Sequence, residues 1–366
     1  MIRKMEKKLQ NFDANSQTFM SEGAIAAATA AMTEVVDIQK HIEKFGKLLS
    51  TECGFELVGP EGYDVYFTSG ASEANCYILN GCARAFAAKT RVMPHIITSS
   101  ADSYSTLECL RRLEKDRLCQ ITILPLGDTK KDYGVVDVQE LKSAMRENTC
   151  LVSITISGAD LGVINNIQAL AKVARAAGVP FHTDASQFIG RSSLYLSTHG
   201  IDAASLTFHK IHGPPGIGAI IIRKTLADGY GLPAPITSSC NAGLLVAAEA
   251  AFKESLESRR QKNIHMRSMK DLLKSILSEK LKTANICDNA SADIYWASPA
   301  EDSIVMPNTL TFAIDKCDVS QLIHSLRKRS LMVGTANKMV RVSFGDDVDA
   351  SGIKRLGRIL IELLNL

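Results

Sequence analysis

Short apolar runs alternate with amphipathic segments over more than a hundred residues of this chain. The apolar runs predict strands, and apolar positions spaced three and four residues apart predict the helices between them. The predicted strands are 63–68, 95–98, 120–124, 150–156 and 179–183, and the predicted helices are 72–87, 106–115, 138–146 and 167–177. Strands that are apolar throughout are typical of a mostly parallel sheet with both faces covered and with its ligand site beyond the carboxyl ends of the strands. The pattern therefore predicts an α/β fold.

A second unit is predicted after the prolines at positions 233 and 235. Its elements are expected to be a long helix, bent or broken, over 242–282, strands 307–314 and 339–344, and helices 320–328 and 350–364. This order of elements is typical of an α+β arrangement. We expect a large domain over residues 11–250 and a smaller C-terminal α+β domain over 251–366, with residues 1–10 packing on the smaller one.

Charge and composition exclude several classes of protein. The 366 residues include 42 Lys and Arg and 39 Asp and Glu, for a net charge of +3, and 46% are hydrophobic. This balance is typical of a soluble globular protein and does not favour nucleic acid or a membrane surface as a partner. No apolar run approaches the ~20 residues that span a bilayer. The polar residues that follow position 10 do not resemble a secretory signal, so a cytoplasmic protein is expected.

The nine cysteines are odd in number, are spread along the chain and form no C-x-x-C pair. This distribution argues against a disulfide framework and against a zinc site, and no metal ligands are predicted. Most of the cysteines are expected to be small buried hydrophobic side chains.

One lysine, Lys210, lies between an apolar strand and a turn rich in glycine and proline. Burial near strand ends lowers the pKa of an amine, so that its neutral form can attack an aldehyde. Asp184 ends another apolar run, 26 positions upstream (210 minus 184). Pyridoxal phosphate chemistry uses both groups, because the amine forms a Schiff base with the aldehyde and an anion keeps the pyridine nitrogen protonated.

A predicted strand turns into a helix at Gly70, Ala71 and Ser72. Free N–H groups at the start of a helix bind anions, and the Ser72 hydroxyl adds a donor, so this turn predicts a phosphate site. Each feature also has an ordinary explanation, since glycine turns are common and a lone Asp at a strand end often caps a helix. Their occurrence together, each at the end of a predicted strand, favours a pyridoxal phosphate site.

On these residues the sequence resembles the class V aminotransferases, and within them the cysteine desulfurases. The resemblance runs from about residue 11 to the C-terminus and is strongest at the Gly70 turn, in His182-Thr-Asp-Ala-Ser-Gln187 and at His209-Lys210. It implies the PLP-dependent transferase fold type I, with a mostly parallel seven-stranded sheet, and a homodimer. It also implies pyridoxal 5′-phosphate as cofactor, L-cysteine or a similar small sulfur amino acid as substrate, and a sulfur acceptor protein as partner.

The resemblance implies a role for each residue of the site. Lys210 carries the Schiff base, Asp184 is the partner of the pyridine nitrogen, and Gln187 contacts the ring hydroxyl oxygen. Arg341 pairs with the substrate carboxylate. The groups that bind the cofactor are then Gly70, Ala71, Ser72, Ser103, Thr207, His209 and Ser239, the last of them reaching the phosphate in the other subunit.

Three departures from the family pattern bear on the chemistry. Ser103 stands where the family has a histidine that stacks on the ring, with Tyr104 next to it, and Ala159 stands where the family has an asparagine. Residues 330–340, which correspond to the loop that carries the sulfur-accepting cysteine, contain none and are few for a long mobile loop. Cys240 is the one candidate substitute, although a buried structural thiol is the commoner role for such a residue.

Two hypotheses follow. The first is a PLP-dependent enzyme similar to a cysteine desulfurase, either a transferase or a lyase. The alternative is a catalytically impaired homodimer that keeps the scaffold for binding or regulation, which the departures at Ser103 and Ala159 and the missing cysteine favour. The retention of Asp184, Gln187 and Lys210 as a set favours the enzyme, because a scaffold has no need of an anion and a lysine placed for pyridine chemistry.

Overall fold

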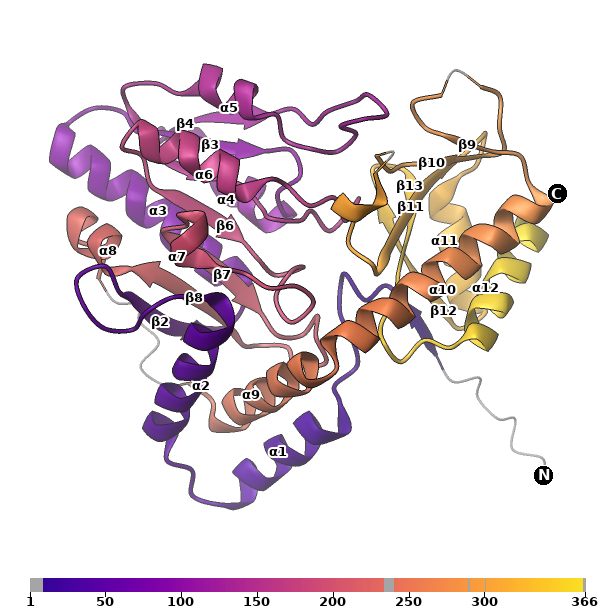
Figure 1. Cartoon of the computed structure of the whole chain (residues 1–366), viewed down its shortest axis with the longest axis horizontal. Coiled ribbons are helices and arrows are strands. Elements are labelled where there is room, and N and C mark those ends of the chain that lie inside the picture. Colours follow the sequence, from indigo (N-terminus) through magenta and orange to yellow (C-terminus); the bar gives the residue numbers. More distant parts are fainter. Residues whose placement is uncertain (1–8, 234–239, 289, 300, 365–366) are drawn as a thin grey trace.

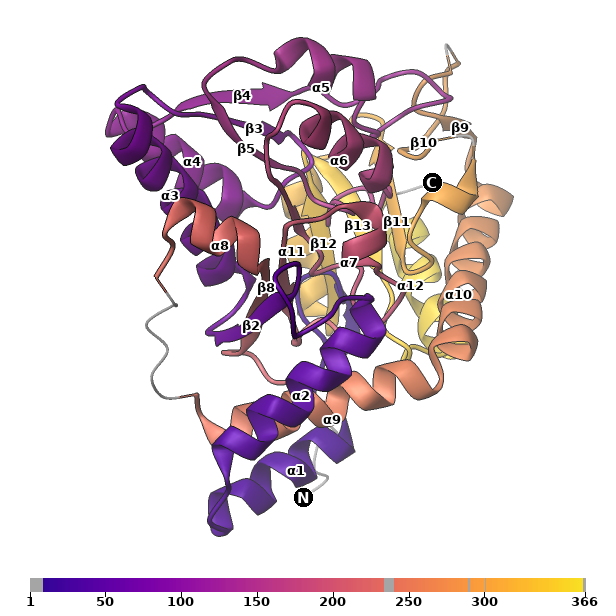
Figure 2. The same cartoon turned by 60° about the vertical axis from the view of Figure 1, so that its left-hand side comes forward.

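The computed structural model describes residues 9–233, 240–288, 290–299 and 301–364, which form two β-sheets with their helices (Figure 1). The larger sheet and its helices occupy one side of the molecule, and the smaller sheet, orange and yellow, occupies the other. Figure 2 shows how α9 and α10 run in succession from one part to the other. None of the described helices is both long and apolar enough to cross a membrane.

Seven strands form the larger sheet, in the order β2-β8-β7-β6-β5-β3-β4. Neighbouring strands are parallel except around β8, which is antiparallel to β2 and to β7. The strands are β2 (Tyr63–Thr68), β3 (His95–Ser99), β4 (Gln120–Leu124), β5 (Thr149–Ser153), β6 (Phe181–Asp184), β7 (Ala203–Thr207) and β8 (Gly218–Arg223). The five strands predicted between residues 63 and 183 correspond to β2 through β6, so the sheet is the mostly parallel one that the alternation predicts.

Helices cover both faces of this sheet because successive strand residues point to opposite sides. Ile97 and Val152 pack on one face with side chains of α2, α5, α6 and α9. Their neighbours Ile96 and Leu151 pack on the other face with α3 and α4. The helices of this part are α1 (Glu22–Thr33), α2 (Ile38–Cys53), α3 (Ala71–Thr90), α4 (Tyr104–Lys115), α5 (Val138–Ala144), α6 (Ile167–Ala176), α7 (Leu196–His199), α8 (Lys224–Tyr230) and α9 (Ala242–Glu257).

The long helix expected after the prolines is two helices, with a break at Ser258 between α9 and α10 (Arg259–Lys280). α9 packs against α1 through small side chains such as Ala24 and Ala247. In contrast, α10 contributes Leu273 to the core of the smaller sheet. The expected domain boundary at residue 250 lies inside α9, and the division into domains stays a prediction.

The smaller sheet has six strands in the order β1-β12-β13-β11-β10-β9. They are β1 (Gln10–Phe12), β9 (Thr283–Asn285), β10 (Ile294–Trp296), β11 (Thr309–Ile314), β12 (Leu331–Ala336) and β13 (Met339–Ser343), with α10, α11 (Val319–Lys328), α12 (Ala350–Leu363) and the short 3-10 helix Asp302–Ile304 around them. β1 pairs in parallel with β12, so a segment close to the start of the chain is part of this C-terminal sheet.

A tight hairpin occupies the segment expected to be a short loop. β12 and β13 pair as antiparallel strands. They are joined by Asn337 and Lys338, whose φ angles are +46° and +65°. Two consecutive left-handed residues make the kind of two-residue turn that matches the twist of a hairpin. The chain therefore extends no long loop from this position, and the hairpin contains no cysteine.

Candidate active site

Three segments singled out in the sequence meet at one edge of the larger sheet. Asp184 ends β6 and Thr207 ends β7, and these strands are parallel neighbours. Gly218, the first residue of β8, is paired both with Thr207 and with Thr68 at the end of β2. A Cβ atom built on Gly218 would lie 2.6 Å from the Gly70 Cα, so the strand end and the glycine turn are in direct contact. The turn, the aspartate and the lysine segment therefore share one site.

Asp184 is buried, with 6% of its surface exposed, and neutral donors surround its carboxylate. The Asn75 side-chain amide donates to Oδ2 at 2.8 Å, and the Ser186 backbone N–H donates to Oδ1 at 2.9 Å. Asn75 also donates to the Thr106 hydroxyl at 3.0 Å. The sequence analysis missed Asn75, although a buried amide one turn into the helix after the glycine turn was available as a signal.

The Lys210 amine lies in a mixed electrostatic environment. Burial lowers its pKa to about 8, while the negative charge of Asp184 raises that pKa and the charges of Arg191 and Arg341 lower it. A pKa near 8 leaves part of the amine neutral at neutral pH, as a nucleophile requires. Asp184 ends β6, and Lys210 follows the end of its parallel neighbour β7, so both lie at the same end of the sheet.

Arg191 holds the backbone of this site and was not identified from the sequence. Its side chain is buried, with 6% exposed. Nη2 donates to the Lys210 carbonyl at 2.6 Å, and Nη1 donates to the Gln187 carbonyl at 3.1 Å and to its Oε1 at 3.3 Å. Burial lowers the pKa of Arg191 to about 10. Nothing in the local sequence marks this arginine, because its partners are 4 and 19 residues away in the chain.

The Gln187 side chain faces the N-terminal segment. Its Nε2 donates to the Asn15 carbonyl at 2.9 Å, and its Oε1 accepts from Arg191. Both polar ends of Gln187 thus have protein partners, so contact with a ring hydroxyl requires one of these bonds to be exchanged. Its predicted role stays a prediction.

The start of α3 provides a cradle for an anion. Gly70 is the N-cap of this helix, and no described side chain caps it. A Cβ atom built on Gly70 would meet no atom within 4 Å, so there is open space beside the turn. Ala71 is half-buried and Ser72 is exposed. The Ser69 N–H is bound by Glu73 Oε2 at 2.6 Å, which fixes the turn and leaves the N–H groups of the first helical turn for a ligand.

Thr207 and His209 extend this cradle on its other side. The Thr207 hydroxyl and His209 Nδ1 are 2.8 Å apart. Burial lowers the pKa of His209 to about 4, and the charge of Lys210 lowers it further, so the imidazole is neutral at pH 7. A neutral ring that accepts at one nitrogen donates at the other. Three kinds of group therefore lie at these strand ends: N–H and hydroxyl donors, the Lys210 amine and the Asp184 carboxylate. They match the phosphate, the aldehyde and the ring nitrogen of pyridoxal phosphate, so the site fits this cofactor.

Arg341, on β13, lies among acidic groups rather than open to solvent. The residue is 7% exposed. Nη1 is 3.0 Å from Asp160 Oδ1, and Nη2 is 2.8 Å from Asp13 Oδ1 and 3.0 Å from the Ser16 hydroxyl. Nε has no hydrogen-bond partner among the described residues. The Asp160 side chain is 57% exposed, which makes it the partner most easily displaced by another carboxylate.

A cavity of about 250 Å³ adjoins the Arg341–Asp160 ion pair. It lies between the strand ends of the larger sheet and the β12–β13 hairpin. Ala101, Gly158 and Asp160 line it from the first side, and Asn337 and Met339 line it from the second. Part of a small ligand can therefore enter where the larger sheet faces the hairpin.

The residues that stand where the sequence differs from the family pattern have other roles in the structure. Ser103 is the N-cap of α4, accepting from the Thr106 N–H at 3.3 Å, and Tyr104 is 77% exposed and lines a surface cavity with residues of α3 and α4. The Ala159 carbonyl accepts from the Asn15 amide at 2.8 Å. Cys240 is half-buried and burial raises its pKa, which disfavours a thiolate. Ser239 lies outside the described residues.

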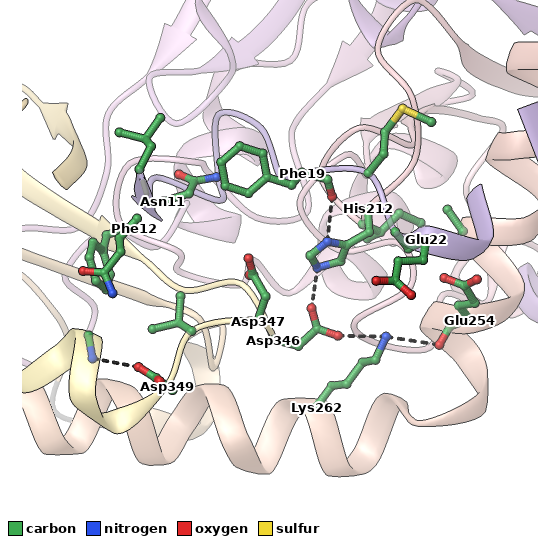
Figure 3. A pocket seen from close by; sticks show the side chains of 18 of the residues that line it. Asn11, Phe12, Phe19, Glu22, His212, Glu254, Lys262, Asp346, Asp347 and Asp349 are labelled. Carbon is green, nitrogen blue, oxygen red and sulfur yellow. Dashed lines mark hydrogen bonds and ion pairs between the residues drawn. The ribbon is translucent and has the colours of Figure 1, made fainter. Parts of the chain in front are cut away.

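The turn after Lys210 is anchored to the smaller sheet by His212 (Figure 3). His212 Nδ1 lies 2.8 Å from the Phe19 carbonyl, and Nε2 contacts Asp346, which also pairs with Lys262 at 2.8 Å. Burial opposes the charged imidazole, but the bond to Asp346 and its charge raise the pKa of His212 above its ordinary value. This network lines a cavity of about 1030 Å³ on the outer side of the lysine turn.

Comparison with known proteins yields one family. The family model described as "Aminotransferase class-V" matches residues 55–236. The protein named "Cysteine desulfurase IscS" from Rickettsia africae (strain ESF-5) is 32% identical over 317 residues, which cover 79% of this chain and 73% of that protein. Its namesake from Rickettsia massiliae (strain Mtu5) is 29% identical over the same shares. The one from Enterobacter sp. (strain 638) is 37% identical over 169 residues, 46% of this chain and 40% of that protein.

Solved structures share the fold over the length of the chain. A structure titled "NIFS-LIKE PROTEIN" has a TM-score of 0.81 at 22% identity and covers 98% of this chain and 99% of its own. A second, the NifS-like protein from Rickettsia africae ESF-5, has a TM-score of 0.81 at 17% identity and covers 98% and 100%.

Proposed function

From the fact that this chain belongs to the class V aminotransferase family, we propose that it is a PLP-dependent enzyme of the cysteine desulfurase kind. Its substrate is L-cysteine or a similar small sulfur amino acid. One observation carries the proposal: the Lys210 amine, with its pKa near 8, and the buried Asp184 carboxylate lie at adjacent strand ends beside an uncapped helix start.

Each residue of this edge has a task in such an enzyme. When bound, pyridoxal phosphate supplies an electron sink for the substrate α-carbon. The N–H groups of the first turn of α3, with Ser72, Thr207 and His209, hold its phosphate. Lys210 Nζ would hold the cofactor by its aldehyde group and, when free, would move a proton at the substrate α-carbon. Asp184, through its negative charge, keeps a proton on the ring nitrogen.

Arg341 orients the substrate by its carboxylate. Because Nη1 is paired with the exposed Asp160, an incoming carboxylate takes the place of Asp160, while Asp13 and Ser16 keep the guanidinium in position through Nη2. An arginine fork suits this exchange, since it offers two parallel donors to a carboxylate.

The β12–β13 hairpin cannot accept the substrate sulfur, because it contains no cysteine. We propose that sulfur leaves either to a separate acceptor protein or as sulfide, and that the chain acts as a homodimer. Alanine among the products indicates transfer of sulfur, whereas pyruvate indicates β-elimination. The comparisons do not support the alternative of an impaired scaffold, and release of neither product by the cofactor-loaded protein would favour it.

The decisive experiment compares cofactor attachment in the wild-type protein and in Lys210→Ala. The wild-type protein incubated with pyridoxal phosphate should acquire visible absorbance and, after borohydride reduction, a covalent cofactor on the peptide that contains Lys210. Lys210→Ala should show neither, while Lys316→Ala, an exposed lysine paired with Asp315, should behave like the wild type. A wild-type protein that stays colourless and unlabelled contradicts the proposal.

A further inference from the structure

Two cysteines lie side by side where α3 packs on α4. Cys76 is on α3 and Cys109 is on α4, and both residues line one surface cavity. The Asn80 side-chain amide donates to Cys109 Sγ at 3.3 Å and so fixes the orientation of that sulfur. Asn80 also donates to the Cys76 carbonyl at 2.8 Å, so a single side-chain amide contacts both cysteines. Two cysteines this near to each other on packed helices are candidates for a disulfide.

The pair is open to small molecules on one side. Cys109 is 7% exposed, while Cys76 is half-buried. Both belong to the lining of a surface cavity of about 480 Å³, which also includes Arg84 and Arg112. A reagent of the size of hydrogen peroxide can therefore reach the cavity that Cys76 lines, where Arg112 is paired with Glu108.

The surroundings divide the roles between the two sulfurs. Hydrogen bonding from Cys109 lowers the pKa of Cys76, burial opposes this, and the charge of Arg112 lowers it further. The same hydrogen bond, together with burial, raises the pKa of Cys109. The first proton is thus lost from Cys76, the more exposed of the two, and thiolates are the form of cysteine that reacts with peroxides.

We propose that Cys76 and Cys109 form a reversible thiol–disulfide site that is oxidised by hydrogen peroxide, a property that goes beyond the proposed function. The Cys76 thiolate attacks one peroxide oxygen, the O–O bond breaks, and hydroxide leaves with the proton that Cys76 gave up, as water. Cys109 then loses its proton and attacks the Cys76 sulfur, the S–O bond breaks, and a second water leaves. The two sulfurs lose two electrons, and the peroxide is reduced to two waters.

The two cysteines are connected to Asp184 through residues close to them in the sequence. Asn75, which donates to Asp184, precedes Cys76, and Thr106, which accepts from Asn75, lies one helical turn before Cys109. Closing the disulfide links the two helices within one turn of this hydrogen-bonded pair.

The test is peroxide treatment of the full chain followed by peptide mapping under non-reducing conditions. We expect one new cross-linked product, joining the Cys76 and Cys109 peptides with the loss of two hydrogens, which dithiothreitol reverses. Cys317, a half-buried thiol in the connection between β11 and α11, should remain free and serves as the internal control. A cross-link to any other cysteine, or oxidation of Cys76 without a cross-link, overturns the proposal.

Alkylation by iodoacetamide tests the pairing without any oxidant. Cys76 should react at least about tenfold faster than Cys317 at pH 7. Cys109→Ser retains a donor and should keep this rate, whereas Cys109→Ala removes the donor and should slow it. Equal rates for Cys76 and Cys317 in the wild type contradict the pairing, and this readout does not depend on either variant folding.

Discussion

The two halves of the site treat their central charge differently. Asp184 is held by neutral donors, the Asn75 amide and the Ser186 N–H, so its negative charge is positioned but not cancelled. Arg341 is held by two carboxylates, Asp13 and Asp160, so its positive charge is cancelled until a ligand competes. Under the proposed function, the cofactor side around Asp184 is therefore ready as it stands, whereas the substrate side around Arg341 needs an exchange of partners.

The largest effect is expected from removing the charge on the cofactor side. Asp184→Asn keeps the shape but leaves the ring nitrogen without an anion, and turnover of L-cysteine should fall at least ~100-fold, the scale of losing one positioned charge. The matched control is Asp202→Asn, at the opposite end of the same strands, where Asp202 pairs with Arg223. Similar turnover in Asp184→Asn and the wild type would break the comparison.

A second test concerns the support beneath the lysine. Arg191→Ala leaves the carbonyls of Lys210 and Gln187 without their buried donor and should lower the free energy of unfolding by about 3 kcal/mol. Urea denaturation measures this change. Arg329→Ala, which removes a surface pair with Glu362, should cost less than about 1 kcal/mol. If both variants show the same small decrease in the free energy of unfolding, the Arg191 contacts do not stabilise the site.

The low pKa of Lys210 predicts a pH dependence of stability in the cofactor-free protein. Because the folded-state pKa is near 8, below the ordinary value of 10.5, the unfolded chain binds more protons between these values, and folding is penalised below pH 8. Lys210→Met removes the penalty. Its stability relative to the wild type should therefore fall by on the order of 1–3 kcal/mol as the pH rises from 8 to 10.5. A difference that is flat with pH contradicts the burial of this amine.

The smallest effect is expected on the substrate side. Asp160→Asn removes a half-exposed ion pair that is worth about 1 kcal/mol or less. The cofactor-loaded variant should therefore bind L-alanine, as an unreactive carboxylate ligand, up to about fivefold more tightly in a spectral titration. Asp315→Asn, an exposed carboxylate elsewhere, is the control. Weaker binding by Asp160→Asn would show that this carboxylate assists the ligand instead of competing with it.

Much of the fold could be predicted from local pattern. The alternation of apolar runs and amphipathic segments correctly located β2 through β6, and the comparisons confirm both the class V resemblance and the fold. The helix expected over 242–282 was correct in type, but its break at Ser258 depends on α9 and α10 packing against different partners. The β12–β13 hairpin was missed because Asn-Lys lacks the glycine that usually marks such a turn.

The site divides in the same way. The sequence by itself determined that Lys210, Asp184 and the Gly70 turn follow apolar strands and are candidates for a site, because a charged or flexible residue at the end of an apolar strand is a local signal. Only the tertiary structure decided what those residues touch: Asn75 against Asp184, Arg191 beneath Lys210, and Asp13 and Asp160 on Arg341. The physical reason is that the strength of a charge depends on burial and on partners from distant parts of the chain, which come together only when the chain folds.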